Sequence, residues 1–473
     1  MRTTIKRYSW IVLVFFLSAC GTTPPVPTSS PTATDTLTFT PVPATPTGTP
    51  TPTSTPTLTP IPVAPGPSPT STPLPLVTVD GLRVAYIIDT TLYVQDSGGW
   101  PIPLAQCFGH CSALFSDDGQ KLAYYKTYYG TGNYTVYAIN ADGSKDRARV
   151  TGSLLAGLDL GYDDNTELSS MAFVPGTHQL LFSTQEFNSP VNRDEYHSHA
   201  QPNYDLLIVN TDTGVIKQLL KPGQGGNFLV SPDGKLVAVQ TPDHIDVVDI
   251  NGQVVRPNLA AYLQVVGFFG EPWLSMFWTQ DSSKLFVLLP IPTSEILTNT
   301  VWPYLLTVWQ YPMDGSPSVE IRLDPAPSGN YFDISPDGNW IAYTNELIVG
   351  KPESDKPEGV YLGNLRDGSS QLLGEAQIIG ASVYYRWNPN SEYFIFADYY
   401  SSLKYIGNIH GETAQFFNGR FGRWLDASRY LRGFDATMGD VDKETLVTTV
   451  QLPASFLENN NNWRSFTFVY VKP

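Results

Sequence analysis

The stretch Ser231-Pro232-Asp233-Gly234-Lys235-Leu236-Val237-Ala238 decides the fold, because the chain repeats it. A close copy reads Ser335-Pro336-Asp337-Gly338-Asn339-Trp340-Ile341-Ala342. In each copy a bulky apolar residue precedes a tight turn, and an apolar residue returns three positions after the turn closes. Proline, aspartate and glycine supply the backbone angles of the turn, and the flanking apolar residues then face one core. The stretch therefore predicts a β-hairpin.

Looser copies of this hairpin bring the total to seven. Their turns lie at residues 115–119, 173–177, 230–234, 278–282, 334–338, 387–391 and 424–428, and the returning apolar residues are Leu122, Leu180, Val237, Leu285, Ile341, Phe394 and Leu431. A second family of turns alternates with the first, at residues 96–99, 140–143, 212–214, 251–252, 314–315, 367–368 and 410–411. The alternation repeats about every 40 to 60 residues with four strands in each unit, which is the period of β-propeller blades.

The two best copies, at residues 231–238 and 335–342, resemble the repeat of TolB-like propellers, which is shared with the propeller domains of prolyl oligopeptidase relatives. Asp117-Asp118-Gly119-Gln120-Lys121-Leu122-Ala123 is a looser copy. The resemblance covers about residues 80 to 473 and implies an all-β fold, a β-propeller of four-stranded blades. Unrelated activities share this scaffold, so the resemblance implies no particular function. The Ser-Pro-Asp-Gly residues are interpreted as turn residues without a chemical role.

Seven blades are expected, with eight as the alternative. The strand at residues 82–87 and the turn at residues 96–99 have no inner strand before them, and the last unit has no clear outer hairpin after it. Joining these two halves closes a ring of seven blades. However, residues 84–86 have the pattern of a second strand, and residues 445–450 with residues 466–471 could complete the last blade alone. That arrangement gives eight blades.

The N-terminus has the parts of a bacterial export signal. The basic residues are Arg2, Lys6 and Arg7, and the apolar run covers residues 11–17. The signal ends in the small residues of Leu17-Ser18-Ala19-Cys20-Gly21. The apolar run is too short for a permanent membrane span. The last five residues resemble the lipobox of bacterial lipoproteins, which implies removal of residues 1–19 and a diacyl group on Cys20. Two acyl chains anchor a protein stably. An ordinary signal with a chance cysteine is the alternative.

Residues 20–76 are expected to form the lipidated cysteine and a disordered tether, and residues 77–473 the propeller. The tether is rich in proline, threonine and serine and carries a single charge, at Asp35. Such a segment buries too little apolar surface to offset its ordering entropy. At ~3.1 Å per residue, an extended polyproline-II-like chain of this length reaches on the order of 170 Å. This reach would hold the propeller clear of the membrane.

The charge of the chain excludes one class of partner. There are 28 lysines and arginines against 44 aspartates and glutamates, so the formal net charge is −16. A strongly negative protein repels phosphate backbones, so no nucleic acid is expected as a partner. The signal places the chain in the bacterial cell envelope, lipid-anchored and extracytoplasmic, where we expect a monomer that contacts the membrane only through its anchor. Neither the receiving leaflet nor glycosylation of the tether follows from the sequence.

The two ends of a propeller differ in their connections. The two hairpin turns of each blade share one end, which we name the turn face, and the remaining connections share the other, which we name the loop face. The long connections all belong to the loop face, at residues 126–134, 152–170, 184–204, 253–272, 290–304 and 345–359. Function usually lies on loops that a rigid scaffold positions, so the loop face is the predicted binding face.

Aromatic residues are frequent on the predicted binding face. The candidates are Tyr128, Tyr129, Tyr134, Phe187, Tyr196, Tyr204, Trp273, Trp302 and Tyr304. Aromatic loops that also carry Asn and Asp suit the recognition of a protein or a saccharide. Loops that merely cover blade edges remain an equal alternative.

Two small groups of residues suggest local chemistry. Asp194-Glu195-Tyr196-His197-Ser198-His199 would place two imidazoles on one side of a strand, but a polar loop is preferred to a metal site, and no metal or other cofactor is expected. Cys107 and Cys111 are the only cysteines besides Cys20. In an oxidising envelope such a close pair predicts a disulfide at the first blade junction, with a metal site that includes His110 as the minor alternative.

Enzymatic function has little support in the sequence. The nucleophile motif Gly-x-Ser-x-Gly is absent, as is any alternation of helices and parallel strands that would form a hydrolase domain. Asp159, Asp163 and Asp164 could pair for glycoside hydrolysis, but sequence cannot set the distance between two carboxylates. We therefore expect a noncatalytic binding or scaffolding module for a protein or envelope glycan. A propeller glycoside hydrolase or lyase and a small-ligand sensor are the alternatives.

Overall fold

A computed structural model defines the architecture of the propeller region. It describes residues 78–88, 90–107, 110–127, 134–158, 162, 166–186, 201–262, 274–291, 305–328, 332–345, 359–375, 383–398, 403–418, 421–432, 437–441, 445–450 and 466–471. The chain divides into two units, residues 1–70 and 71–473, and every described residue belongs to the second. The expected signal, Cys20 and the tether therefore lie outside the described residues.

The described residues form eight antiparallel sheets, which we number as blades 1 to 8 and list from the first strand to the fourth. Blade 1 consists of β33 (Phe466–Tyr470), β1 (Leu82–Ile88), β2 (Thr91–Asp96) and β3 (Ile102–Gln106). Blade 2 consists of β4 (His110–Phe115), β5 (Lys121–Thr127), β6 (Tyr134–Asn140) and β7 (Arg147–Thr151). Blade 3 consists of β8 (Thr166–Phe173), β9 (Gln179–Glu186), β11 (Leu206–Asn210) and β12 (Ile216–Leu220), and β10 (Gln201–Pro202) also pairs with β9.

The remaining blades use consecutive strands. Blades 4 and 5 are β13 (Asn227–Val230), β14 (Leu236–Gln240), β15 (His244–Asp249), β16 (Val254–Ala261); and β17 (Ser275–Trp278), β18 (Lys284–Pro290), β19 (Leu306–Pro312), β20 (Val319–Ile321). Blade 6 consists of β21 (Phe332–Ile334), β22 (Trp340–Asn345), β23 (Gly359–Asn364) and β24 (Ser370–Glu375). Blade 7 consists of β25 (Val383–Trp387), β26 (Tyr393–Asp398), β27 (Leu403–Asn408) and β28 (Thr413–Asn418). Blade 8 consists of β29 (Phe421–Trp424), β30 (Arg429–Arg432), β31 (Thr437–Asp440) and β32 (Thr445–Thr448).

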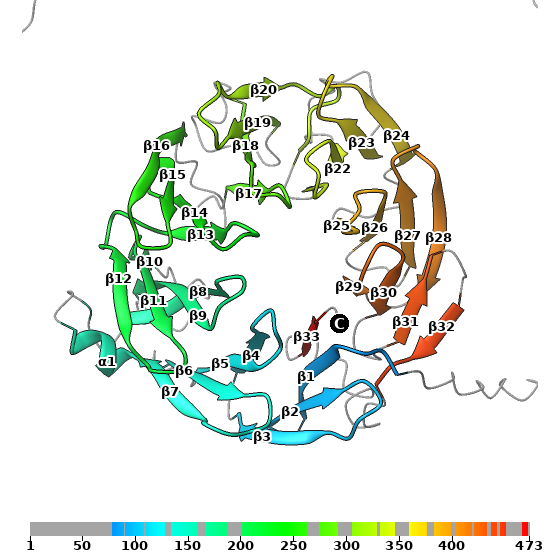
Figure 1. Ribbon diagram of the computed structural model, residues 1–473. Helices are drawn as coiled ribbons and strands as arrows, with labels where there is room; N and C mark the ends of the chain where they lie inside the picture. The colour runs from blue at the N-terminus through cyan, green and yellow to red at the C-terminus, as the bar shows by residue number, and fades with distance from the viewer. Residues whose placement is uncertain are drawn as a thin grey trace, which may run out of the picture. The chain divides into compact units, whose positions relative to one another are not determined.

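The blades follow one another around a ring, with the first strand of each blade toward the centre and the fourth toward the outside (Figure 1). A short helix, α1 (Gly152–Ala156), follows β7 on the outside of the ring. This radial arrangement of antiparallel four-stranded sheets is that of a β-propeller, so the predicted fold class is confirmed. The described residues contain no helix with the length and apolar character of a membrane span.

The ring closes in blade 1, where the two ends of the propeller region meet. β33 pairs antiparallel with β1, with Val84 opposite Phe468, and the Val471 amide donates to the Gly81 carbonyl at 2.9 Å. β29 to β32 complete blade 8 without β33. The structure therefore has eight sheets, as in the alternative, and the expectation of seven was wrong. The error came from taking the first and last units as two halves of one blade. The alternative was wrong in one respect, because residues 466–470 pair with β1 in blade 1 and do not complete the last blade.

The closure exposes an eighth copy of the repeat. Thr78-Val79-Asp80-Gly81-Leu82-Arg83-Val84-Ala85 matches the turn and second strand of the other blades, and Gly81 has the same positive φ, 78°, as the glycines of the intact turns. Val84 faces Phe468 as Val237 faces Val230 in blade 4. The first strand of this copy comes from the other end of the propeller region, which explains why the sequence did not show it.

The apolar core lies between neighbouring blades. Ala123 and Val136 of blade 2, for example, cluster with Phe182 and Leu207 of blade 3, and all four side chains are buried. Other clusters join blades 5 and 6, blades 6 and 7, and blades 8 and 1. Each sheet thus buries both of its faces against the neighbouring blades. The ring is therefore stabilised by packing between blades and not by a hydrophobic core at its centre.

Buried hydroxyl groups organise the inner turns. In blade 4, Ser231 Oγ donates to Asp233 Oδ1 at 2.6 Å and accepts from the Leu236 amide at 2.9 Å, while the Lys235 amide donates to Asp233 Oδ1 at 3.1 Å. Ser116, Ser335 and Thr279 make the same set of bonds in blades 2, 6 and 5. These bonds satisfy backbone amides that the tight turn would otherwise leave unpaired.

The inner turns are also bonded to one another. The Asp233 amide of blade 4 donates to Ser282 Oγ of blade 5 at 3.0 Å, and the Asp337 amide of blade 6 donates to Ser391 Oγ of blade 7 at 3.0 Å. Ser282 and Ser391 occupy the position of the turn glycine and keep its positive φ, at 59° and 63°. In these degenerate copies, serine therefore replaces the glycine that adopts a positive φ most easily, and its hydroxyl accepts a hydrogen bond from the neighbouring blade.

Indole groups join the first strands of successive blades. Trp278 Nε1 donates to the Leu229 carbonyl at 3.0 Å, Trp387 Nε1 to the Asp333 carbonyl at 3.0 Å, and Trp424 Nε1 to the Arg386 carbonyl at 2.8 Å. Each tryptophan stands at the bulky position before the inner turn, and each acceptor comes one residue before that position in the preceding blade. The bulky residue of the repeat is thus also a link between blades.

Candidate functional site

The predicted hairpin turns lie where the sequence placed them. All seven inner turns join the first and second strands of blades 2 to 8, and all seven outer turns join the third and fourth strands of blades 1 to 7. The other connections include the long segments between β9 and β11, between β18 and β19 and between β22 and β23. The described strands therefore separate a face of short turns from a face with long connections.

Most candidate aromatic residues of the loop face lie outside the described residues. This applies to Tyr128, Tyr129, Phe187, Tyr196, Trp273, Trp302 and Tyr304, to residues 194–199, and to Asp159, Asp163 and Asp164. Tyr134 begins β6, but its side chain is not described. Tyr204 is half-buried two residues before β11, with a positive φ of 50°. Among the nine candidates, it is the one whose side chain the structure describes.

A buried polar network lies beside Tyr204. The Asp205 carboxylate accepts hydrogen bonds from the Thr184 amide at 2.8 Å, from Thr184 Oγ1 at 2.6 Å and from the Tyr162 hydroxyl at 2.7 Å. Asn203 Nδ2 donates to Thr184 Oγ1 at 2.8 Å. Asp205 is fully buried, and this burial raises its pKa even though the hydrogen bonds oppose the shift. The network holds the last residues of the 187–205 connection against β9.

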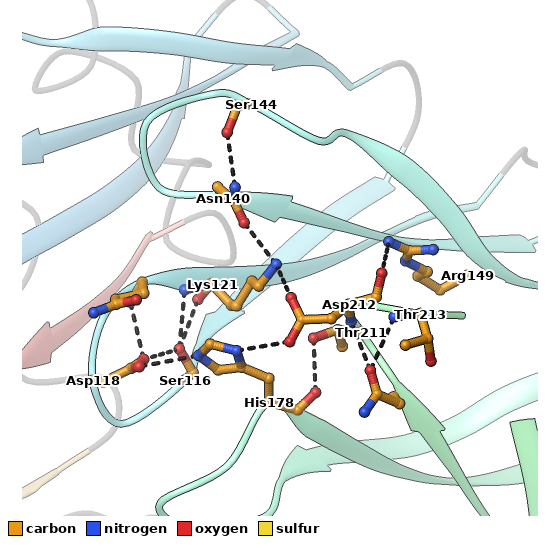
Figure 2. Close-up of polar contacts among 12 residues, drawn as sticks. Ser116, Asp118, Lys121, Asn140, Ser144, Arg149, His178, Thr211, Asp212 and Thr213 are labelled. Atoms are coloured by element: carbon orange, nitrogen blue, oxygen red, sulfur yellow. Dashed lines mark hydrogen bonds and ion pairs between the residues drawn. The ribbon is translucent and has the colours of Figure 1, made fainter. Parts of the chain in front are cut away.

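A second polar cluster lies on the turn face, between blades 2 and 3. Figure 2 shows the His178 ring between two carboxylates, with Asp118 on one side and Asp212 on the other. His178 Nε2 lies 3.0 Å from Asp118 Oδ2, and His178 Nδ1 lies 3.0 Å from Asp212 Oδ2. Asp118 belongs to the inner turn of blade 2, whereas His178 and Asp212 belong to turns of blade 3. We name these three residues with Lys121 the His178 cluster.

Lys121 completes the cluster from β5. Its ammonium lies 2.5 Å from Asp212 Oδ1 and donates to Asn140 Oδ1 at 2.6 Å, and its side chain is only 6% exposed. Arg149 Nη2 donates to the Asp212 carbonyl at 3.0 Å. Two contacts, the one between His178 and Asp118 and the ion pair of Lys121 with Asp212, therefore cross the same boundary between blades.

Both carboxyls of the cluster are held ionised. The hydrogen bond from Lys121 is the largest influence on Asp212 and lowers its pKa, with a further contribution from His178. Burial alone would raise the pKa of Asp118, but hydrogen bonds from Ser116, the Gln120 amide and His178 outweigh it, so that pKa is lowered as well. At neutral pH both groups act only as hydrogen-bond acceptors.

The sequence did not suggest the His178 cluster. Asp118 and Asp212 are 60 and 34 positions from His178, and Lys121 lies in β5, so the four residues form no common motif. Only the packing of blade 3 against blade 2 brings them together. The described residues contain no group of three or more His, Cys, Asp and Glu side chains that could hold a metal ion. The cluster joins blades 2 and 3 through hydrogen bonds and the ion pair of Lys121 with Asp212.

Cys107 and Cys111 meet at the junction of blades 1 and 2, as their spacing suggested. The structure joins them by a disulfide whose Cα atoms are 5.8 Å apart, within the usual range for such bonds. Both cysteines are buried. The bond remains a prediction, and mapping of alkylated peptides before and after reduction would test it.

Comparisons with known proteins bear on the fold only. No protein-family model and no curated protein matches the sequence. Among solved structures, a eukaryotic initiation factor is 14% identical over 79% of this chain and 87% of its own, with a TM-score of 0.48. The β-propeller domain of the Trilobed protease from Pyrococcus furiosus is 12% identical over 74% and 99%, with a TM-score of 0.38. TolB from Acinetobacter baumannii is 15% identical over 61% and 65%, with a TM-score of 0.30.

Proposed function

We propose that the chain is a noncatalytic binding or scaffolding module, anchored outside the cytoplasmic membrane by a diacyl group on Cys20. The propeller recognises a protein or an envelope glycan with its loop face. Residues 20–76 act as the tether between the anchor and the ring. The partner is bound by side chains of the long connections, and no covalent step is assigned to the propeller.

The difference between the two ends of the ring carries this proposal. On the turn face, the connection between β13 and β14 spans residues 231–235, and that between β15 and β16 spans residues 250–253. On the other face, the connection between β18 and β19 spans residues 291–305, and that between β22 and β23 spans residues 346–358. Long connections on a rigid frame provide variable surface at a low cost in stability, which supports recognition at that end.

The bonding of the turn face supports the same assignment. Its turns are tied to the next blade by the bonds of Asp233 and Asp337 described above. The Arg83 guanidinium donates to the Gly119 carbonyl at 2.7 Å, which links blades 1 and 2 in the same way. A face whose polar groups are used within the ring acts as the frame, and the opposite face is free to vary.

Partner capture with matched variants tests the recognition surface. Mature protein on beads is incubated with detergent-solubilised cell envelopes and, separately, with peptidoglycan fragments, so that the two arms distinguish a protein from a glycan. One variant replaces residues 188–198 with Gly and Ser, and a second does the same to residues 347–357. We expect at least one variant to lose more than about tenfold in capture, which corresponds to about 1.4 kcal/mol.

The control variant carries a Gly/Ser insertion after Gly315, in the outer turn of blade 5, and this insertion has the same length as each of the replaced loop segments. A Cβ built on Gly315 meets no atom within 4 Å, so the insertion has open space. This variant should capture the partner as well as the wild type does. Equal capture by both loop-face variants, or loss of capture in the control alone, would contradict the proposal.

The anchor has its own test. Metabolic labelling with a clickable fatty acid should mark the wild-type chain, and detergent phase partitioning should place it in the detergent phase. The variant Cys20→Ser should lose the label and move to the aqueous phase. A labelled or membrane-bound variant would show that Cys20 is not the acceptor.

A further inference from the structure

Hydrogen-bond counting at His178 points to its protonation state. Each ring nitrogen lies 3.0 Å from a carboxylate oxygen, Nε2 from Asp118 and Nδ1 from Asp212. Both carboxyls are ionised and can only accept. A neutral imidazole carries one N–H, so it would satisfy one contact and turn a lone pair toward the other carboxylate. Only the imidazolium form donates in both directions.

We propose that His178 is a proton-dependent clamp between blades 2 and 3. In the protonated form it binds Asp118 of blade 2 while holding Asp212 of blade 3 in place for Lys121. Loss of the proton removes one of the two hydrogen bonds and the attraction of the ring to both carboxylates. The turn-face edge of this blade boundary is therefore tighter at acidic than at alkaline pH.

The other charged groups around His178 favour this reading. Lys121 Nζ is 2.5 Å from Asp212, and Arg149 bonds the Asp212 carbonyl on the far side. Asp117, next to Asp118, accepts from the Gly176 amide at 3.1 Å. Lysine, arginine and aspartate side chains therefore surround the ring from both blades, and histidine is the type of side chain whose charge ordinarily changes between about pH 5 and 8.

His178 contributes to the ionised state of both carboxyls. Its charge and its hydrogen bonds lower the pKa of Asp118 and of Asp212. The two acceptors beside the ring are therefore charged.

His244 provides a matched control within the same protein. Its Nδ1 lies 2.5 Å from Asp243 Oδ1, and its Nε2 lies 3.2 Å from Asp246 Oδ1, so it also stands between two carboxylates. However, His244 and Asp246 belong to β15 and Asp243 directly precedes it, so these contacts stay within blade 4. Protonation of His244 affects contacts within blade 4, whereas protonation of His178 affects contacts between blades 2 and 3.

Denaturant unfolding of the mature protein at about pH 5.5 and about pH 8 tests the clamp across the imidazole range. His178→Gln should lower the unfolding midpoint clearly at the acidic pH and much less at the alkaline pH. Hydrogen exchange, corrected for the intrinsic effect of pH, should show the added opening in β5 and β9. His244→Gln should leave exchange in β5 and β9 unchanged. An equal loss of stability at both pH values would overturn the proposal.

A measurement on the wild type keeps the test independent of the variant's folding. Nitrogen NMR of the imidazole side chains distinguishes a doubly protonated ring from either neutral tautomer, and single substitutions of the other five histidines assign His178 by elimination. Two protonated nitrogens at about pH 5.5 that give way to one as the pH rises would support the clamp. A neutral ring with one protonated nitrogen at every pH would refute it.

Discussion

At the scale of single residues, Ser335 shows how one hydroxyl holds an inner turn. It is 1% exposed, donates to Asp337 Oδ1 at 2.6 Å and accepts from the Trp340 amide at 2.9 Å. Ser335→Ala should destabilise the protein by about 1–2 kcal/mol, because the amide loses a buried acceptor and Asp337 loses a donor. The lowered midpoint would be visible in urea unfolding.

Ser369→Ala is the control for that prediction. Ser369 also donates to an aspartate two residues away, Asp367, at 2.7 Å, but it lies in an exposed outer turn. Water can replace its hydrogen bond, so the midpoint should hardly change. Equal effects of the two substitutions would mean that burial of Ser335 is not what matters.

Asp333 gives a prediction with a defined pH dependence. Burial raises its pKa to about 7 despite the opposing attraction of Arg386, whose Nη1 lies 4.0 Å away. The folded protein therefore holds this proton more tightly than the unfolded chain does, and the stabilisation from the protonated carboxyl is complete below its ordinary pKa of 3.8. It is lost as the pH rises to about 7.

Asp333→Asn should consequently stabilise the protein above neutral pH by about 1–3 kcal/mol and have little effect near pH 3. Urea unfolding at several pH values measures the difference. Asp367→Asn serves as the opposite case, because hydrogen bonds from Ser369 lower the pKa of Asp367 and its charged form is the favoured one. A stabilisation by Asp333→Asn that does not vary with pH would count against a raised pKa of this half-buried carboxyl.

Local sequence reveals some of these residues and not others. The Ser-Pro-Asp-Gly copies were correctly interpreted as turns, because a turn is formed by adjacent residues. The alignment of the seven inner turns placed Thr279 and Asn388 at the position of Ser231, but it did not predict their hydrogen bonds, such as the bond from the Tyr393 amide to Asn388 Oδ1 at 3.0 Å. The His178 cluster could not be predicted, since its residues become neighbours only through blade packing.

At the scale of strands and turns, the tryptophan links make a prediction about blade packing. Trp387 is 7% exposed, and its Nε1 donates to the Asp333 carbonyl of the preceding blade at 3.0 Å. Trp387→Phe keeps an aromatic ring against Phe394 but leaves that carbonyl without the indole donor. We expect a loss of about 1 kcal/mol in unfolding free energy, measured by urea denaturation.

Trp100→Phe is the matched substitution, because Trp100 is 90% exposed in the outer turn of blade 1. Its effect on stability should be close to zero. A similar loss in both variants would assign the effect to ring size and remove the role of the hydrogen bond.

The outer turns illustrate the limit of sequence prediction for elements. The position of each outer turn followed from a glycine and the residue before it, and in four of the seven turns this pair is Asp-Gly or Asn-Gly, which forms a turn by itself. The contacts of these turns with neighbouring blades did not follow from the sequence. Gly252 has a φ of 86°, and a Cβ there would lie 2.6 Å from the Leu219 carbonyl oxygen of blade 3. The glycine thus serves both the turn and the close approach of the neighbouring blade, and only the first of these is readable from the sequence.

At the scale of the whole molecule, removal of β33 should open the ring. A chain that ends at Asn462 leaves the edge of β1 without its partner, although Val84, Ala85 and Tyr86 are buried in the intact protein. We expect a loss of more than about 3 kcal/mol and a tendency to associate through the free edge. Thermal unfolding and analytical ultracentrifugation measure both.

Addition of a synthetic peptide of residues 463–473 should restore the lost stability. Restoration would show that the strand acts by pairing with β1, whereas a scrambled peptide should have no effect. A truncated chain with unchanged stability would mean that the closure contributes nothing to folding.

The number of blades shows why whole-molecule features are the hardest to predict. The repeat defines a blade wherever its strands are consecutive, which is the case for blades 2 and 4 to 8. In blade 1, Phe466–Tyr470 and Leu82–Ile88 are paired across the whole propeller region. Sequence periodicity contains no information about that pairing, so seven and eight blades were both compatible with it.

The interruption of blade 1 has a consequence for engineering. Because the Val471 amide and the Gly81 carbonyl already stand where a covalent inner turn would run, a short linker from residue 471 to residue 78 can replace the gap. New termini can then be cut into another inner turn, such as that of blade 6, without loss of any strand pairing. The point at which the ring is joined to the proposed tether thereby becomes a matter of choice, and circularly permuted versions would test whether that point affects partner capture.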